Sequence, residues 1–204
     1  MEQVVISLAV EDQLSEAVLK KILRIAEDRF LVTTCYSREG FGYLKKNIAG
    51  FNNAAKGMPF LVLTDLDTSE CPPALIKEWL PYPKHPNLIF RVAVREVEAW
   101  ILADWKGFAM YIGISNDIIP ADVESIKNPK QKLIELTKKS RNRRIRESIV
   151  PGSNSDAKQG PDYNGALITF VNEFWDIKTA MENSISLKKT VKAVIDFKPV
   201  YSVQ

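Results

Sequence analysis

The chain begins with four short, mostly apolar segments separated by amphipathic stretches. The apolar segments, which are rich in β-branched residues, are residues 4–10, 30–35, 59–65 and 88–94. The stretches with apolar residues at helical spacing are residues 15–29, 43–55, 74–80 and 96–111. Short apolar runs are typical of strands buried inside a parallel sheet. The alternation predicts an α/β fold with a mainly parallel sheet flanked by helices.

The last 80 or so residues follow a different pattern. They are mostly helical in character, with a polar loop at residues 151–161 and a helix at residues 166–175. The length of 204 residues suits one domain with a small appendage. We therefore expect an α/β core over residues 1–125 and a helical C-terminal extension over residues 126–204, packed on that core.

The composition is that of a folded protein, with 46% hydrophobic and 26% charged residues. Neither a signal peptide nor an apolar run long enough to span a membrane is evident, so no membrane partner is expected. Cys35 and Cys71 lack metal-ligand spacing and are interpreted as reduced thiols of a cytoplasmic protein. The net charge of +3 neither requires nor excludes a polyanionic partner.

Acidic residues follow three of the predicted strands. Glu11 comes after the first, Asp65 and Asp67 end the third, and Glu96 and Glu98 come after the fourth. Ligands of open α/β sheets bind beside the carboxyl ends of the strands, so we expect these acids to converge there. Clustered carboxylates suit Mg²⁺ or Mn²⁺, which keep several waters and bridge substrate phosphates.

Each acidic group also has a simpler structural interpretation. An isolated Asp-x-Asp is usually a solvated turn, and acids are favourable in the first turn of a helix. Asp65 and Asp67 would point to opposite faces of an extended segment, so the turn after the strand has to redirect one of them. The position of every acid just beyond a buried strand favours the metal-binding interpretation.

These segments resemble the motifs of the topoisomerase–primase (TOPRIM) superfamily. Residues 10–16, where Glu11 ends a strand and leads into a helix, resemble the first motif, and residues 63–67 resemble its Asp-x-Asp motif. Glu16 and residues 95–104 are similar to small bacterial TOPRIM proteins and to nucleases of the overcoming-lysogenization-defect (OLD) class. The resemblance covers about residues 4–105 and implies a TOPRIM-like, Rossmann-like core.

The resemblance implies metal-dependent phosphodiester chemistry with Mg²⁺ or Mn²⁺. Glu11 would act as a metal ligand or general base, and Asp65 and Asp67 would hold the metal. Glu98 would be a further ligand or an orienting group. Lys158 is a candidate for stabilising charge on the phosphate.

Other residues have lesser parts in this interpretation. Glu16 and Glu96 are secondary candidates for the site. Asp12 stands where the family generally has glycine, which crowds the turn and adds a negative charge. No histidine or tyrosine is evidently placed as a nucleophile, so a topoisomerase-like covalent mechanism has little support. His85, in a proline-rich loop, is interpreted as a surface residue.

A basic segment lies at residues 138–146. Its six cations are Lys138, Lys139, Arg141, Arg143, Arg144 and Arg146. They could contact the phosphates of a nucleic acid without regard to sequence, or simply form a solvated helix face. No aromatic residue interleaves with them, so a platform for stacking the bases of single strands is not indicated.

Two hypotheses on function follow. The first is a metal-dependent nuclease, or a related phosphoryl-transfer enzyme, acting on DNA or RNA as a bacterial defence or toxin effector beside an ATPase partner. The second is a degenerate TOPRIM module that binds nucleic acid or the ATPase without cleavage, which Asp12 favours. A response-regulator-like domain would require a lysine at the end of a late strand, and none is evident. Self-association is left open.

Overall fold

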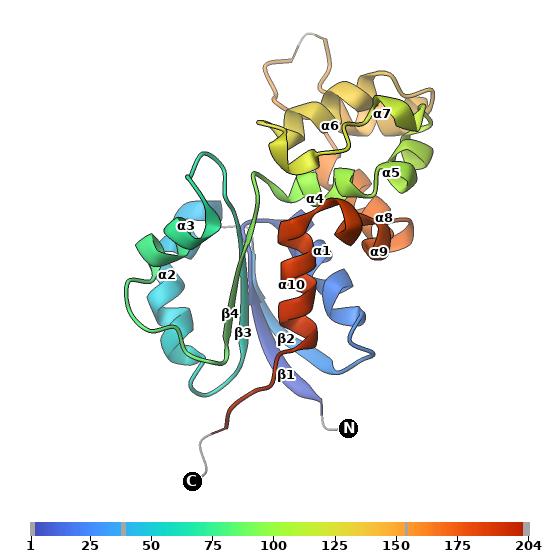
Figure 1. The fold of residues 1–204 in the computed structure, drawn as a ribbon. Helices are drawn as coiled ribbons and strands as arrows, with labels where there is room; N and C mark the ends of the chain where they lie inside the picture. Colours follow the sequence, from blue (N-terminus) through green and yellow to red (C-terminus); the bar gives the residue numbers. More distant parts are fainter. Residues whose placement is uncertain (1–2, 38–39, 154, 202–204) are drawn as a thin grey trace. The chain divides into compact units, whose positions relative to one another are not determined.

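The computed structural model describes residues 3–37, 40–153 and 155–201 (Figure 1). Its internal contacts divide the chain into two compact units. The sheet unit comprises Met1–Val94 and Lys188–Gln204, and the helical unit comprises Arg95–Leu187. The chain therefore leaves the sheet unit once and returns to it at the end.

The sheet unit is built on four parallel strands in the order β2-β1-β3-β4. The strands are β1 (Val4–Ala9), β2 (Phe30–Tyr36), β3 (Phe60–Asp65) and β4 (Leu88–Ala93). Five of the six residues of β3 are buried, which is why this central strand is a continuous apolar run in the sequence. The predicted α/β fold with a parallel sheet is confirmed.

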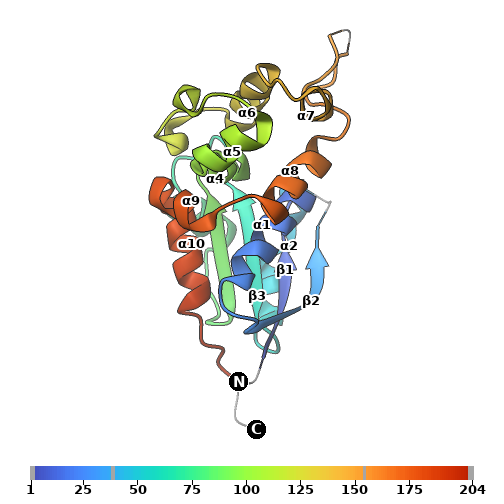
Figure 2. The ribbon, with the colours of Figure 1, turned by 90° about the vertical axis from the view of Figure 1, so that its right-hand side faces the viewer.

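Three helices connect the successive strands of the sheet. They are α1 (Gln13–Arg24), α2 (Gly40–Ala54) and α3 (Pro72–Trp79). Helices α2 and α3 cover one face of the sheet, while α1 and the sheet-unit part of α10 (Ile185–Ile195) cover the other (Figures 1 and 2). Beneath α2 and α3, Phe51, Trp79 and Phe90 belong to one buried apolar cluster with the strands. Strands β1, β3 and β4 are thus mostly removed from water, as expected of a parallel sheet, whereas no residue of the edge strand β2 is buried.

The helical unit confirms the predicted helical character of the C-terminal region. Its helices are α4 (Val97–Ala103), α5 (Trp105–Ile112), α6 (Pro129–Lys138), α7 (Arg143–Ile149), α8 (Tyr163–Glu173) and α9 (Ile177–Asn183), with single 3-10 turns at Asn116–Ile118 and Val123–Ser125. Every residue of α4 is buried, and α4 packs against α6 and α9. These contacts place the division after Val94, whereas the sequence pattern predicts it after residue 125.

The helix predicted over residues 96–111 is two helices, and the prediction of one continuous helix was wrong. Asp104 ends α4 and caps α5, and its carboxylate accepts hydrogen bonds from the backbone N–H groups of Gly107 (3.0 Å) and Asp176 (2.8 Å). A Cβ at Gly107 would clash with the Asp104 carboxylate, so glycine permits this cap. The apolar pattern continues through the break and therefore conceals it.

Asp12 has a local structural role as the N-cap of α1. Its side chain accepts a 2.8 Å hydrogen bond from the backbone N–H of Ser15, one of the helix donors that has no partner within the helix. The residue that departs from the TOPRIM pattern is thus explained by the start of the helix.

No helix in the described part of the chain is long and apolar enough to cross a membrane. Cys35 and Cys71 form no disulfide. Burial, together with the charge of Glu16, raises the pKa of the Cys35 thiol to about 12. Cys35 is therefore a poor nucleophile at neutral pH, because the thiolate is the reactive form.

We expect Asp12→Ala to lower the free energy of unfolding by about 1 kcal/mol, because the cap of α1 is lost. Asp12→Asn should change it by only a few tenths of that amount, because the amide oxygen can accept the same hydrogen bond. Urea unfolding followed by circular dichroism measures both. Equal destabilisation by the two substitutions would show that charge, rather than capping, is what Asp12 contributes.

Candidate functional site

Glu11 lies just beyond β1, and its carboxylate is bound to the end of β3. Its Oε1 accepts hydrogen bonds from the hydroxyl of Thr64 (2.6 Å) and from the backbone N–H of Asp65 (2.9 Å). Thr64 and Asp65 are the last two residues of β3. The pairing of β1 with β3 therefore brings Glu11 to the start of the Asp-Leu-Asp segment.

The pKa of Glu11 is raised, and burial is the main cause. The hydrogen bonds from Thr64 and Asp65 oppose this shift, whereas the negative charges of Asp67 and Asp12 add to it. Both aspartates are thus near enough to repel the Glu11 carboxylate. A cation bound between such groups would relieve the repulsion.

The turn after β3 redirects the chain between Asp65 and Asp67. Leu66 is buried, and its backbone N–H donates to the carbonyl of Ala93 at the end of β4 (2.9 Å). Asp67 then adopts a positive φ of 48°, a conformation that residues other than glycine rarely occupy. This strained turn exposes Asp67 while keeping its charge within range of Glu11.

The fit of this edge to a divalent cation depends on its oxygen ligands. Within the described residues, no group of three or more His, Cys, Asp or Glu side chains is arranged to hold a metal ion. Glu11 and Asp67 are nevertheless two carboxylates whose negative charges act on one another at this edge. Mg²⁺ usually takes one or two carboxylates from a protein and completes its shell with water and substrate phosphates, so these residues fit such an ion.

Glu16, a secondary candidate, has structural partners. Its carboxylate pairs with Lys20 (2.7 Å) and accepts a hydrogen bond from the hydroxyl of Ser37 (2.8 Å). Burial acts to raise the pKa of Glu16, but the hydrogen bonds from Lys20 and Ser37 prevail and lower it. Glu16 therefore ties α1 to the segment that follows β2.

Glu96 and Glu98 lie in the helical unit, within a second polar network. Glu98 is buried, and its Oε1 accepts a hydrogen bond from the hydroxyl of Tyr163 (2.9 Å) and lies 3.6 Å from Nζ of Lys130. Glu96 accepts a hydrogen bond from the backbone N–H of Lys130 at the start of α6 (2.8 Å). Burial raises the pKa of Glu98; Lys130 opposes this shift and Glu96 adds to it.

The predicted acids are therefore divided between the two units. Glu11, Asp65 and Asp67 belong to the sheet unit, whereas Glu98 joins α4 to α6 and α8 inside the helical unit. Tyr163 and Lys130 were not among the predicted site residues. No signal in the sequence points to them, because Tyr163 lies 65 positions from Glu98 and reads as an ordinary apolar helix residue.

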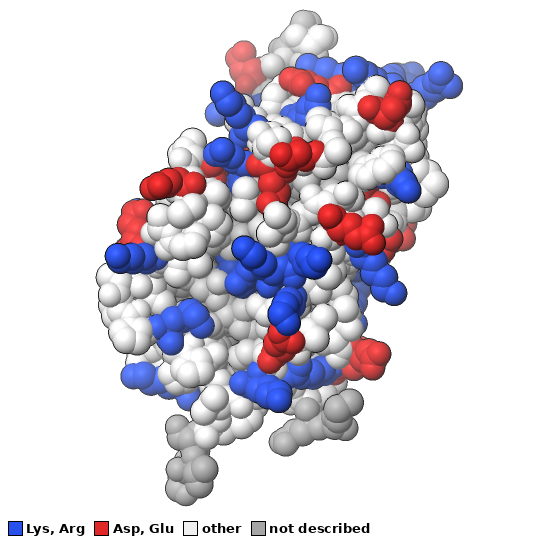
Figure 3. Space-filling view, in the orientation of Figure 1, with Lys and Arg blue, Asp and Glu red and all other residues white. Residues whose placement is uncertain are grey.

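The basic segment runs from the end of α6 into α7. Arg143 pairs with Glu147 (2.7 Å), and the guanidinium of Arg146 donates to the carbonyl of Ser140. Arg144 is exposed, and so is Lys158 in the loop before α8. Lys and Arg side chains gather along the upper right of the space-filling view, over α7 (Figure 3).

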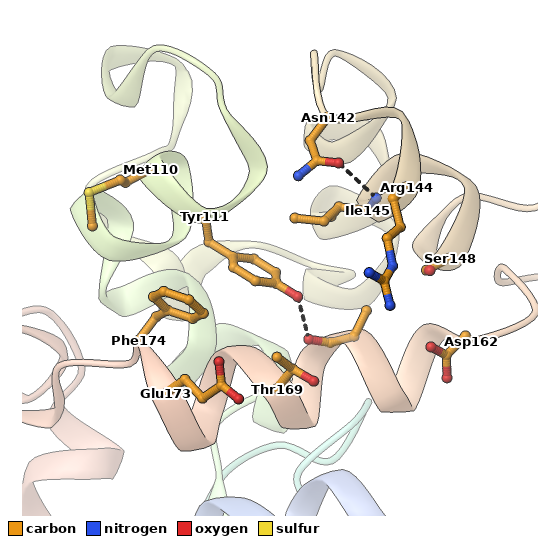
Figure 4. A pocket seen from close by; sticks show the side chains of 11 residues that line it. Met110, Tyr111, Asn142, Arg144, Ile145, Ser148, Asp162, Thr169, Glu173 and Phe174 are labelled. Carbon is orange, nitrogen blue, oxygen red and sulfur yellow. Dashed lines mark hydrogen bonds between the residues drawn. The ribbon is translucent and has the colours of Figure 1, made fainter.

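A cleft of about 540 Å³ lies beside the basic segment, between α5, α7 and α8 (Figure 4). We call it the α5–α7–α8 cleft. Its lining residues are Met110, Tyr111, Asn142, Arg144, Ile145, Ser148, Asp162, Ala166, Thr169, Glu173 and Phe174. Only Arg144 was predicted as a functional residue, because the others come from segments without an evident motif.

Comparisons with known proteins identify no relative of this chain. No family model, curated protein or solved structure matches the chain. The resemblance to the TOPRIM superfamily therefore stays a prediction that depends on the residues of the motifs.

We expect Tyr163→Phe to lower the free energy of unfolding by about 2 kcal/mol, because the buried Glu98 carboxylate loses a hydrogen bond. Tyr111→Phe is the matched control, since it removes a 2.8 Å hydrogen bond to the neutral carbonyl of Ala166 and should cost about 1 kcal/mol. Chemical denaturation of both variants tests this. An equal or smaller loss for Tyr163→Phe would contradict a special role for the Glu98 contact.

A pH dependence follows from the raised pKa of Glu98. Because the folded protein holds this proton more tightly than the unfolded chain, the stabilisation is full in acid and is lost as the pH rises through the folded-state pKa. Relative to Glu98→Gln, the wild type should therefore lose unfolding free energy as the pH rises above 4.5, the ordinary pKa of glutamate. Unfolding curves over this range measure the difference, and a constant difference would show that Glu98 does not titrate as described.

Proposed function

We propose that the protein is a divalent-metal-dependent nuclease, or a related phosphoryl-transfer enzyme, that acts on DNA or RNA. The observation that carries the proposal is the position of Glu11, whose carboxylate is held at the end of β3 within electrostatic range of Asp67. Carboxylates concentrated at the carboxyl edge of a parallel sheet suit an ion that binds phosphate.

The residues of the edge have separate tasks in this proposal. Glu11 and Asp67 would hold Mg²⁺ or Mn²⁺, with Asp65 beside them. A bound ion of this kind lowers the pKa of a coordinated water and offsets charge on the phosphate. The donors Thr64 and Asp65 fix one oxygen of Glu11. If the aspartates alone hold the metal, Glu11 would instead be the general base that accepts a proton from water.

Fewer residues support the substrate class and the biological role of the protein. The cations of residues 138–146 support a polyanionic substrate. A place beside an ATPase in bacterial defence rests on the TOPRIM resemblance, and a cytoplasmic location rests on the interpretation of Cys35 and Cys71 as reduced thiols. A module that binds nucleic acid or the ATPase without cleavage is the second candidate, and it is favoured by Asp12, whose negative charge acts on Glu11.

The proposal is tested with purified protein, plasmid DNA and RNA, in Mg²⁺, Mn²⁺ or EDTA. We expect cleavage that requires the metal and falls about a hundredfold or more in Glu11→Gln and Asp67→Asn. Gln keeps an oxygen that can accept the hydrogen bonds from Thr64 and Asp65, so the fold should be retained. Glu78→Gln is the control, because Glu78 is an exposed carboxylate of the same unit that pairs with Lys45.

Two results would contradict the proposed nuclease activity at this edge of the sheet. Cleavage that persists in Glu11→Gln and Asp67→Asn would place the reaction elsewhere or assign it to a contaminant. Binding of nucleic acid without cleavage, unchanged by either substitution, would support the non-cleaving module.

A further inference from the structure

The α5–α7–α8 cleft has an exposed apolar end. Met110 is 74% exposed and Phe174 is 47% exposed, although both are large apolar side chains. The ring of Tyr111 lies 5.4 Å from that of Phe174, and its hydroxyl donates to the carbonyl of Ala166 (2.8 Å). Tyr111 is therefore held in place, and the two rings present a preformed apolar surface inside the cleft (Figure 4).

The other end of the cleft is polar and carries a cation. Arg144 extends from α7 toward α8 (Figure 4). The pKa of Tyr111 is raised, first by burial and then by Glu173 and Asp162, while Arg144 lowers it, so all three charges act on the Tyr111 hydroxyl. Within the described residues, Arg144 forms no salt bridge with either acid. Its guanidinium donors remain accessible to an anionic group.

The cations continue beyond the cleft. A second hollow, of about 460 Å³, shares Arg144 and Ser148 with the cleft and adds Arg143 together with its ion-pair partner Glu147. A third, of about 470 Å³, is lined by Lys139 and Arg141. A chain of phosphates leaving the cleft would therefore meet further positive charges of the basic segment.

We propose that the cleft accepts an unpaired base of a single-stranded nucleic acid. The base packs against Phe174 and Tyr111, and a neighbouring phosphate contacts Arg144. Bases of every kind can stack on an aromatic ring, and cations beside the rings hold the backbone. The cleft volume of about 540 Å³ is sufficient for a base with its sugar. The inference rests on the proposed function, which it deepens by naming single strands as the substrate class.

The tertiary structure thus places aromatic rings beside the basic segment, which contains none in its own sequence. The absence of aromatic residues between its cations argued against a stacking platform, yet α5 and α8 bring Tyr111 and Phe174 beside Arg144. The carboxylates of Asp162 and Glu173 also suit a nucleobase, since a carboxylate accepts hydrogen bonds from the amino group of cytosine. A duplex keeps its bases stacked and paired, so inserting one would first cost the energy of opening the helix.

Fluorescence anisotropy of labelled oligonucleotides in EDTA tests binding without cleavage. The probes are a cytosine-containing single strand, an abasic strand with the same number of phosphates, and a duplex. We expect the single strand to bind most tightly, and Phe174→Leu to weaken its binding roughly tenfold while leaving the abasic strand unaffected. Arg144→Gln should weaken both strands, because it removes a contact to phosphate.

Matched control variants distinguish the loss of a contact in the cleft from the general effect of removing an aromatic ring or a positive charge elsewhere. Tyr82→Leu changes an aromatic residue that is 45% exposed outside the cleft, and Arg24→Gln removes an exposed cation of α1. Both should bind as the wild type does, and circular dichroism should show that all variants are folded.

The inference is overturned if no oligonucleotide binds, if the abasic strand or the duplex binds as tightly as the single strand, or if Phe174→Leu has no more effect than Tyr82→Leu. These results leave the proposed nuclease standing if cleavage still requires Glu11. Conversely, base-dependent binding without any cleavage supports the proposed binding of a base in the α5–α7–α8 cleft and contradicts the proposed nuclease activity.

Discussion

The parallel pairing of β1 with β3 is the constraint on which the candidate metal edge depends. The register of this pair sets Ala9 opposite Val62, so both strands end at the same edge of the sheet. Glu11 can then reach Thr64 and Asp65, although more than fifty residues separate them in the chain. Because both strands are buried between helices, neither can shift by one residue without turning apolar side chains toward the wrong face.

The helical unit is held together in a different way, by carboxylates that accept hydrogen bonds between segments distant in the sequence. Glu98 binds Tyr163, Asp104 binds the backbone of Asp176, and Glu124 accepts from the hydroxyl of Ser184 (2.6 Å). Short helices bury little apolar surface each, so such contacts contribute to their fixed arrangement. Buried acceptors that lost their partners would be costly, which makes these contacts specific as well as stabilising.

The two units offer complementary chemistry for one proposed reaction. The sheet unit provides carboxylates with a neighbouring strained turn at Asp67, a combination suited to a metal ion and a phosphate. The helical unit provides a cation at Arg144 and exposed rings at Tyr111 and Phe174, a combination suited to the bases and backbone of a single strand. Cleavage and recognition would then be assigned to different parts of the chain.

The strands, their parallel arrangement and the acids at their ends follow from local patterns, because burial on both faces demands apolar runs such as that of β3. The amino-acid order alone was also sufficient to place Glu11 and Asp65 at the carboxyl ends of strands, whereas the tertiary structure decided that these two strands are neighbours. The amino-acid order was not sufficient for contacts that need a distant partner. The break at Asp104 requires Asp176, Glu98 requires Tyr163, and the rings beside Arg144 come from two other helices. Such partners are selected by how the helices pack, and packing leaves no periodic signal in any single segment.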